Sequence, residues 1–358
     1  MVMRSDIIEI DEAPAPRREP ARLTAQDKDA VLLALSGGSV VDWHGLAFRT
    51  YDDVNHFLDL WLCDPSQQAW ARERLQYIYN QAVNYLEEHI GLTFRHEVRR
   101  PRDVRDAFLR ASMRERFSRD RIQYCAVLKL MHVINHLEMQ ELRSQAAFRE
   151  IDLIEIANEK VLAAAEAMRA ALPLRAFYGN RKTRPSVITK LLAKRESTAA
   201  TVYDKLRFRI VTETREDIVP AIAWLFRNLV PFPAVIPGES VNSLLTPAEV
   251  EAAAADHSGL GGVLRPGQQA VNPHSGAVYQ VINFIVDLPV RVYDIPGVPV
   301  PTHRALLGEA VSVLVEFQVV DAASDARNEE GESCHDAYKA RQRSRVYERL
   351  GRSPHSRR

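Results

Sequence analysis

Two carboxylates stand inside segments whose composition is otherwise typical of buried β-strands. Asp204 lies in segment 202–214 and Glu316 lies in segment 312–321, and both segments are rich in β-branched and aromatic residues. Burying a carboxylate is costly unless it is paired with a cationic group or holds a cation. Carboxylate oxygens are also the ligands that hard divalent cations prefer. The pair therefore indicates a metal site with Asp204 and Glu316 as its ligands.

The alternation of side chains along a strand predicts which residues share a face with each carboxylate. On the first strand Asp204 shares its face with Leu206, Phe208 and Ile210, and on the second Glu316 shares its face with Leu314 and Gln318. The alternative to a metal is an ion pair, because Arg207 and Arg209 lie within the first strand and could neutralise a carboxylate.

A basic stretch lies just upstream of the first strand. Segment 178–195 begins with turn residues and then enters a helix that has Ser186 near its start. Its cations are Arg181, Lys182, Arg184, Lys190 and Lys194. Because Lys and Arg neutralise phosphate oxygens, the stretch indicates a polyphosphate-binding surface. A solvated basic helix face is the alternative.

The first half of the chain has the apolar spacing of amphipathic helices. Helices are predicted over 52–62, from Trp70 to near Gly91, and over 102–117, 122–142 and 151–171. We expect them to form a helical bundle or cap. His132 and His136 lie at i and i+4, a spacing found in metal sites. Because no third ligand accompanies them in the sequence, packing or hydrogen bonding is the favoured role.

Strand patterns and one long irregular segment mark the second half. A helix is predicted over 215–229, a strand that includes Tyr279 over 276–287, and a charged helix over 335–350. Segment 232–275 is rich in Gly, Pro, Ser and Asn, which is typical of a functional lid or a mobile insertion. Tyr279 is either a core aromatic or a platform on which a base stacks.

These patterns divide the chain into four regions. We expect a disordered tail over 1–25, a helical domain over 26–175, a sheet domain over 176–350 and a basic tail over 351–358. The predicted fold class is α+β, with a helical N-terminal region followed by a mixed β-sheet that helices flank.

The composition limits the classes of partner. Lys plus Arg equals Asp plus Glu at 47 each, so no overall basic excess points to nucleic acid. The three cysteines, Cys63, Cys125 and Cys334, lack the spacing of a zinc or redox motif, which fits a reducing cytoplasm. No window approaches the roughly 18 apolar residues of a membrane span, and the N-terminus lacks the apolar run of a signal peptide. We therefore expect a cytoplasmic protein without a membrane partner.

The order of these features resembles the synthetase domain of the RelA/SpoT family, which makes guanosine tetra- and pentaphosphate, the alarmones of the stringent response. The shared order is a basic loop and helix, an Asp strand, a helix, an irregular segment, a Tyr strand, a Glu-x-Gln strand and a helix that carries Tyr338 and Lys339. The resemblance covers about 175–345 and implies a nucleotidyltransferase-like fold. The chain is also similar to a bacterial family that carries such a divergent domain behind a helical half.

The individual motifs match in part. In the family's G-R-x-K-x-x-Y-S-x-x-x-K motif the residues in register are Gly179, Lys182, Ser186 and Lys190, with Asn180 and Pro185 as departures and Arg181 one position after the lost Arg. The D-L-x-x-x-R motif is matched by Asp204 and Arg209, G-Y-x-S-x-H by Tyr279, and E-x-Q-x-R-T by Glu316 and Gln318. Asn283 stands at the family's His, and Val320 and Asp321 stand at its Arg-Thr pair. The metal carboxylates are kept, whereas several nucleotide-contacting positions are not.

The resemblance implies a Mg²⁺-dependent transfer of a pyrophosphoryl group from ATP to a hydroxyl of a second substrate. Asp204 and Glu316 would hold Mg²⁺, and Glu316 would help to activate the acceptor hydroxyl. The contacts to nucleotide and phosphate would come from Arg181, Lys182, Ser186, Lys190, Arg209, Tyr279 and Gln318.

The departures leave the acceptor open among a guanosine nucleotide, an adenosine nucleotide and tRNA. They also leave an alternative function, a catalytically inactive nucleotide-sensing or protein-binding module on the same fold. The helical half could contact a protein partner or a second copy of the chain, or restrain the sheet domain.

Overall fold

The structure is a computed structural model. It describes residues 8–9, 23, 27, 30–32, 35, 48–113, 119–146, 148–181, 184–193, 206–236, 238–246, 249, 279–299, 304–328, 344, 346–348 and 350–351.

The five helices predicted for the first half of the chain are confirmed. They are α2 (Tyr51–Leu60), α3 (Ala69–Glu88), α5 (Arg105–Ser112), α6 (Arg119–Gln145) and α7 (Glu150–Ala171). A further short helix, α4 (His96–Arg99), is not predicted from the sequence. The start of α2 shows why the sequence folds this way, because Thr50 and Asp53 form a capping box that satisfies free backbone N–H groups. Val54, Phe57 and Leu58 then give the helix one buried face.

The fold also contains a six-stranded mixed sheet and further helices. Its strands are β1 (Ile8–Glu9), β2 (Leu174–Arg181), β3 (Leu206–Thr212), β4 (Val241–Asn242), β5 (Ile282–Arg291) and β6 (Ala310–Asp321), in the spatial order β1-β2-β3-β6-β5-β4. Strands β3 and β6 pair in parallel, whereas the other neighbours pair antiparallel. Further helices are α8 (Arg184–Ala193), α9 (Ile218–Asn228), α11 (Arg304–Leu307) and α12 (Ala322–Asn328), with short 3-10 turns at Phe232–Ala234 and Val292–Asp294. The predicted α+β fold class is thus confirmed.

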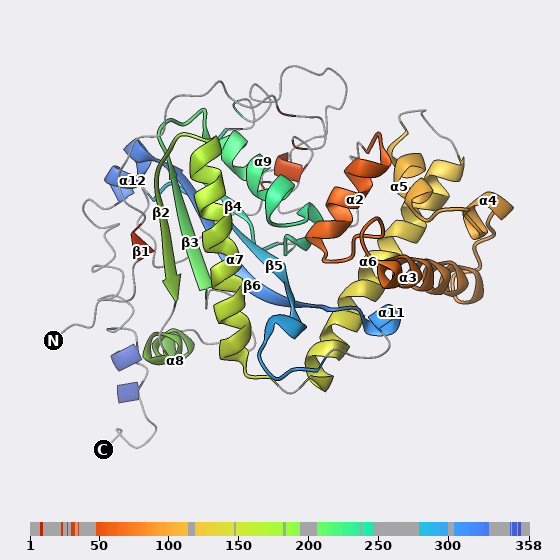
Figure 1. Ribbon diagram of the computed structural model, residues 1–358. Helices are drawn as coiled ribbons and strands as arrows, with labels where there is room; N and C mark the ends of the chain where they lie inside the picture. The colour runs from red at the N-terminus through yellow and green to blue at the C-terminus, as the bar shows by residue number, and fades with distance from the viewer. Residues whose placement is uncertain are drawn as a thin grey trace.

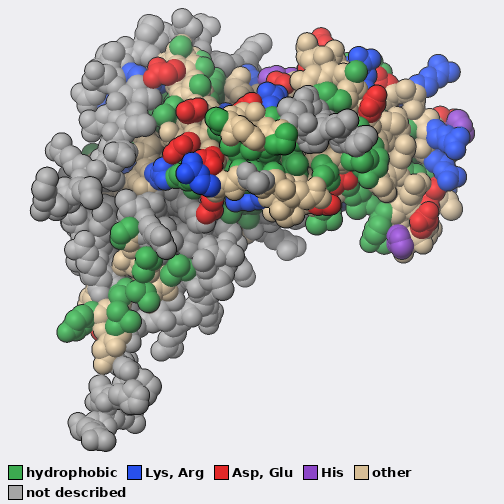
Figure 2. Space-filling view, turned by 60° about the horizontal axis from the view of Figure 1, so that its bottom comes forward, with side chains coloured by type: hydrophobic (Ala, Val, Ile, Leu, Met, Phe, Trp, Pro, Cys, Tyr) green, Lys and Arg blue, Asp and Glu red, His purple; other side chains and the backbone are tan. Residues whose placement is uncertain are grey.

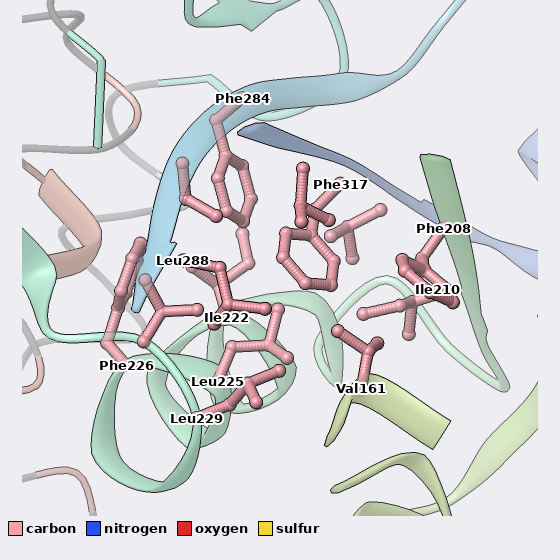
Figure 3. Packing of buried hydrophobic residues seen from close by; sticks show 14 of the residues in the cluster. Val161, Phe208, Ile210, Ile222, Leu225, Phe226, Leu229, Phe284, Leu288 and Phe317 are labelled. Carbon is pink, nitrogen blue, oxygen red and sulfur yellow. The ribbon is translucent and has the colours of Figure 1, made fainter. Parts of the chain in front are cut away.

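One face of the sheet is aromatic and buried under two helices. Phe208 of β3, Phe317 of β6 and Phe284 of β5 form a continuous row with ring centroids 5.9 and 5.8 Å apart. Figure 3 shows these rings pointing toward α9 and toward Val161 of α7. Since Phe208 and Phe317 alternate with the polar residues of their strands, this packing turns the polar residues to the opposite face.

The buried residues fall into two clusters. One joins the sheet with α7 and α9, and the other joins α2, α3, α5 and α6. Figure 1 shows α7 lying across the sheet, with α2 to α6 gathered beside it. Helix α7, which the sequence patterns group with the helical domain, therefore packs as a layer of the sheet's own core. No described helix is long and apolar enough to cross a bilayer.

Two local predictions are wrong. Residues Tyr178 to Arg181, predicted as a turn before a helix, are the second half of β2. Tyr279, predicted to lie in a strand, precedes β5, which begins at Ile282. Turn-forming Gly179 misled the first prediction, because here the missing side chain serves close packing: an added Cβ would lie 3.0 Å from Cε1 of Phe208.

This close approach makes a stability prediction. Phe208 is fully buried between Phe177 and Phe317 and has little room to move. Gly179→Val should therefore lower the free energy of unfolding by about 1–3 kcal/mol, the usual cost of overpacking a core. Chemical denaturation of the two proteins measures the difference, with Gly179→Ala as the graded comparison. A Gly179→Val protein as stable as wild type would show that the strands can separate freely at this point.

Candidate functional site

The face of the sheet opposite the aromatic row carries polar residues from four strands. The parallel register of β3 and β6 sets Arg207 beside Glu316 and Arg209 beside Gln318. The antiparallel neighbours add Asn180 of β2 beside Arg207 and Asn283 of β5 beside Gln318. We call Asn180, Arg207, Arg209, Asn283, Glu316 and Gln318 the polar face. Residues directly opposite each other in a sheet point the same way, so backbone register alone brings these side chains together.

Glu316 lies at the centre of the polar face and is buried. Its Oε2 accepts a hydrogen bond of 2.9 Å from Nε of Arg207, and its Oε1 accepts one of 3.1 Å from Nε2 of Gln318. In the amide orientation that satisfies both of its groups, Asn283 also donates to Oε1 at 2.8 Å. Both carboxylate oxygens are therefore held by donors of the protein.

Arg209 is the second charge of the polar face that is largely shielded from solvent, with 16% of its side chain exposed. Its Nη1 donates to the hydroxyl oxygen of Tyr279 at 3.0 Å, and its Nη2 lies 2.5 Å from Oδ1 of Asp325 on α12. Burial alone lowers the pKa of Arg209, but Tyr279 and Asp325 outweigh it and hold the pKa above its usual value. The guanidinium thus stays charged.

The Nε of Arg209 is buried and has no hydrogen-bond acceptor in the part of the chain that the structure describes. An unsatisfied buried donor is costly, and in native proteins it commonly marks a place where a ligand, ion or water binds. On a guanidinium, the matching ligand is an anionic oxygen. This donor makes the polar face a candidate anion-binding site.

Helix α12 positions the groups around Arg209. It follows β6 directly, and Oδ1 of Asp321 accepts from the backbone N of Ser324 at 3.0 Å in its first turn. At its end, the Asn328 side chain bonds both backbone groups of Gln280, at 3.0 and 2.7 Å. These bonds fix the chain beside Tyr279, so α12 and the segment before β5 hold the two partners of Arg209 in place.

The structure brings four of the predicted site residues together: Arg209, Tyr279, Glu316 and Gln318. Arg181 lies elsewhere, with its Nη1 3.8 Å from Oε1 of Glu155 on α7. Asp204 and Lys182 lie outside the described residues, and for Ser186 and Lys190 the backbone is described, in α8, without the side chains.

The expected face of Asp204 bears on the metal site. Leu206, Phe208 and Ile210 are buried in the aromatic core, away from Glu316. A strand that extended back to Asp204 would therefore turn the two carboxylates to opposite faces, and a shared site requires the strand to begin after Asp204. Strand β3 is described from Leu206 onward, next to β6, and Asp204 lies outside the described residues.

The sequence offers one further member of the site only as an alternative to a metal, and it gives no site role to two others. Arg207 was expected as a possible partner for a carboxylate, and its pairing with Glu316 is the ion-pair alternative to a metal. Asn283 looked like a mere departure from the family's His, and nothing in the sequence pointed to Asp325. Arg207 and Asn283 reach Glu316 through the register of the strands, and Asp325 reaches Arg209 through the turn into α12. The order of residues along the chain gives neither.

His132 and His136 have the structural roles that the sequence favours. His132 packs with its ring edge-on to Trp61, the centroids 5.6 Å apart. Nδ1 of His136 lies 3.4 Å from Oδ2 of Asp287 on β5, which ties α6 to the sheet. No described group of three or more His, Cys, Asp or Glu residues is arranged to hold a metal.

The buried His132 predicts a pH dependence of stability. Burial, with a smaller contribution from His136, lowers its pKa to about 4 from an ordinary 6.5. The folded state disfavours the charged form, so the stabilisation is complete above pH 6.5 and is lost as the pH falls toward 4. Between pH 7.5 and 5 this loss should be about 2 kcal/mol.

Urea unfolding at both pH values measures this loss. His132→Gln should remove about 2 kcal/mol of the wild-type difference between pH 7.5 and pH 5, with His96→Gln as a control at an exposed position. An unchanged difference in His132→Gln would assign the acid sensitivity to other groups.

Comparisons with known proteins give structural neighbours alone. No protein-family model and no curated protein matches the chain. Among solved structures, the chain is similar to small alarmone synthetase 1 from Bacillus subtilis, with 14% identity over 55% of this chain and 85% of that chain at a TM-score of 0.30. The same synthetase bound to its product pppGpp gives 15% identity, 56% and 88% coverage, and a TM-score of 0.32. Small alarmone synthetase 2 from Bacillus subtilis is 14% identical over 54% of this chain and 86% of that chain, at a TM-score of 0.27. At such TM-scores the likeness carries no argument, and the proposals below depend on the residues of this chain.

The charges on the surface are mixed. Figure 2 shows Lys and Arg side chains interspersed with Asp and Glu on the face it presents. With 47 charges of each sign in the sequence, a positive potential for an anionic ligand has to come from local groups such as Arg207 and Arg209.

Proposed function

We propose that the polar face binds the phosphates of a nucleotide and that the chain transfers a pyrophosphoryl group from ATP to the hydroxyl of a second nucleotide. The observation that carries this proposal is the buried Nε of Arg209, a charged donor without an acceptor among the described residues. The matches to the synthetase motifs at Arg209, Tyr279, Glu316 and Gln318 support it.

The proposed chemistry assigns a role to each group. The acceptor hydroxyl oxygen attacks the β-phosphorus of ATP, the bond from that phosphorus to the α,β-bridging oxygen breaks, and AMP leaves. Arg209, with Lys182 and Lys190, neutralises the phosphate charge, and Glu316 accepts the hydroxyl proton. Tyr279 contributes an aromatic ring beside the substrate, and its hydroxyl orients Arg209.

Magnesium is the cofactor that the family resemblance implies, with Asp204 and Glu316 as ligands. The described site does not fit it as arranged, because both oxygens of Glu316 already accept hydrogen bonds, one of them from a guanidinium. The positive charge that faces Glu316 therefore comes from the guanidinium of Arg207, and no step of the proposed reaction depends on a bound metal.

Product analysis tests the proposal. Purified protein is incubated with labelled ATP, with and without Mg²⁺, and with each of GDP, GTP, AMP, ADP, ATP and tRNA, and the products are separated and weighed by mass spectrometry. Transfer predicts AMP together with a pyrophosphorylated acceptor, and the reactive acceptor names the substrate. Absence of any product with every acceptor would reject transfer.

The chain offers a matched control for Glu316. Glu309 is also a buried carboxylate that accepts from an arginine Nε at 2.9 Å, in this case Arg291. Glu316→Gln should abolish product, whereas Glu309→Gln, which alters an equivalent ion pair, should keep it. Equal losses in both variants would mean that the effect comes from stability rather than from chemistry.

The second candidate function is a nucleotide-sensing module without turnover. The ion pair between Arg207 and Glu316 favours it, since this pair occupies the carboxylate that a transferase would use. Nucleotide binding that survives in Glu316→Gln, with no product from wild type, would support sensing. The acceptor, a tRNA substrate and a partner of the helical half all remain proposals for the same product and binding assays.

A further inference from the structure

The ion pair of Glu316 has the geometry of a filled cation site. The parallel register sets the Arg207 and Glu316 backbones side by side, and Nε of Arg207 lies 2.9 Å from Oε2 of Glu316. The Glu316 side chain is 6% exposed and that of Arg207 is 31% exposed, so an almost fully buried carboxylate is neutralised by a guanidinium that reaches the solvent. We infer that Arg207 is a built-in cation, and that it closes Glu316 to divalent metal ions in the resting protein.

The donor set around the carboxylate supports this inference. Gln318 and Asn283 donate to Oε1, and Arg207 donates to Oε2, so each oxygen has a donor from the chain itself. A divalent cation needs direct oxygen contacts of about 2.0–2.6 Å. A cation at Oε2 would meet the guanidinium at close range, where two like charges repel strongly in a poorly solvated site. Metal binding therefore requires that Arg207 leave.

The neighbourhood separates this pair from an ordinary structural one. The pair of Glu309 and Arg291 has the same 2.9 Å contact and similar exposure, but it lies where β5 ends and just before β6 begins. The Arg207 pair instead adjoins Arg209, whose buried Nε lacks an acceptor in the described chain. An anion that contacts Arg209 would thus meet a second guanidinium from Arg207 on the same face of β3.

The inference deepens the proposed nucleotide site, because it states how the charge of that site is supplied, but it does not depend on turnover. It predicts that the wild-type protein takes up a nucleotide's phosphates on arginine side chains, and that Glu316 gains a metal only after the guanidinium is removed. A failed product assay would leave these predictions unaffected.

Direct binding of Mn²⁺, without nucleotide, tests the inference. Mn²⁺ titrations followed by electron paramagnetic resonance compare wild type, Glu316→Gln, Arg207→Ala and the double variant. The wild-type and Glu316→Gln titrations should superimpose. Arg207→Ala should bind one Mn²⁺ ion that wild type does not hold, at least tenfold more tightly than wild type binds any Mn²⁺. The double variant should lose this ion.

Two outcomes would overturn the inference. A Mn²⁺ site present in wild type and missing in Glu316→Gln would show that the carboxylate is open to metal despite Arg207. An Arg207→Ala protein that folds and binds Mn²⁺ no better than wild type would show that Arg207 does not occupy a cation position. If Arg207→Ala does not fold, Arg207→Gln replaces it as a neutral donor, and the comparison of wild type with Glu316→Gln still decides the first outcome.

Discussion

Replacing Arg209 with methionine should lower the free energy of unfolding by about 3 kcal/mol, the lower end of the range for breaking a buried ion pair, because both side chains keep some exposure. The substitution keeps most of the apolar volume of the side chain but removes the charge that faces Asp325 and the donor that Tyr279 accepts. The carboxylate of Asp325 is then left partly buried without its cation. Denaturant unfolding, followed by circular dichroism, measures the loss.

A second variant separates charge from geometry at Arg209. Arg209→Lys keeps a positive charge near Asp325 but cannot contact Tyr279 and Asp325 with a planar fork. Its stability should lie between those of wild type and Arg209→Met. An Arg209→Met protein within 1 kcal/mol of wild type would contradict the assigned burial of this charge.

Replacing Glu316 with alanine should destabilise the protein by a similar amount, about 3–5 kcal/mol. The change removes the acceptor of Arg207, Gln318 and Asn283 at once and leaves three donors on a buried face. Glu316→Gln should cost less, because an amide can still accept through its oxygen.

A double-mutant cycle measures the part that belongs to the ion pair. The stability loss of the Arg207→Ala, Glu316→Ala double variant should be smaller than the sum of the two single losses, since each single variant strands one charge and the double variant strands neither. Additive losses would mean that Arg207 and Glu316 do not interact in solution.

The sequence predicts helices better than the arrangement of the sheet. Apolar spacing and the Thr50 capping box mark helices such as α2 locally, within a few residues. Strand β2 escapes this approach because Gly179 looks like a turn residue, and its strand role follows from contact with Phe208, a residue distant in sequence. Likewise, the sequence patterns group α7 with the helical half, whereas the apolar face of α7 packs against the sheet.

The contacts of the site likewise fall into two kinds, those within one strand, which the sequence predicts, and those between elements, which it does not. Alternation along one strand places Glu316 and Gln318 on a common face, and the structure confirms it. The partners across strands, such as Arg207 for Glu316, depend on register, and Asp325 depends on the turn into α12. Residue type suggests which groups could do chemistry, and the register decides which of them meet.

The affinity of a fluorescent ATP analogue shows whether a nucleotide binds on the polar face through Arg209. Wild type is titrated beside Arg209→Lys and beside Arg291→Lys, an arginine of a similar ion pair away from the polar face. We expect saturable binding to wild type, at least tenfold weaker binding to Arg209→Lys, and unchanged binding to Arg291→Lys. Equal affinity in all three folded proteins, or no binding to wild type, would contradict binding through Arg209.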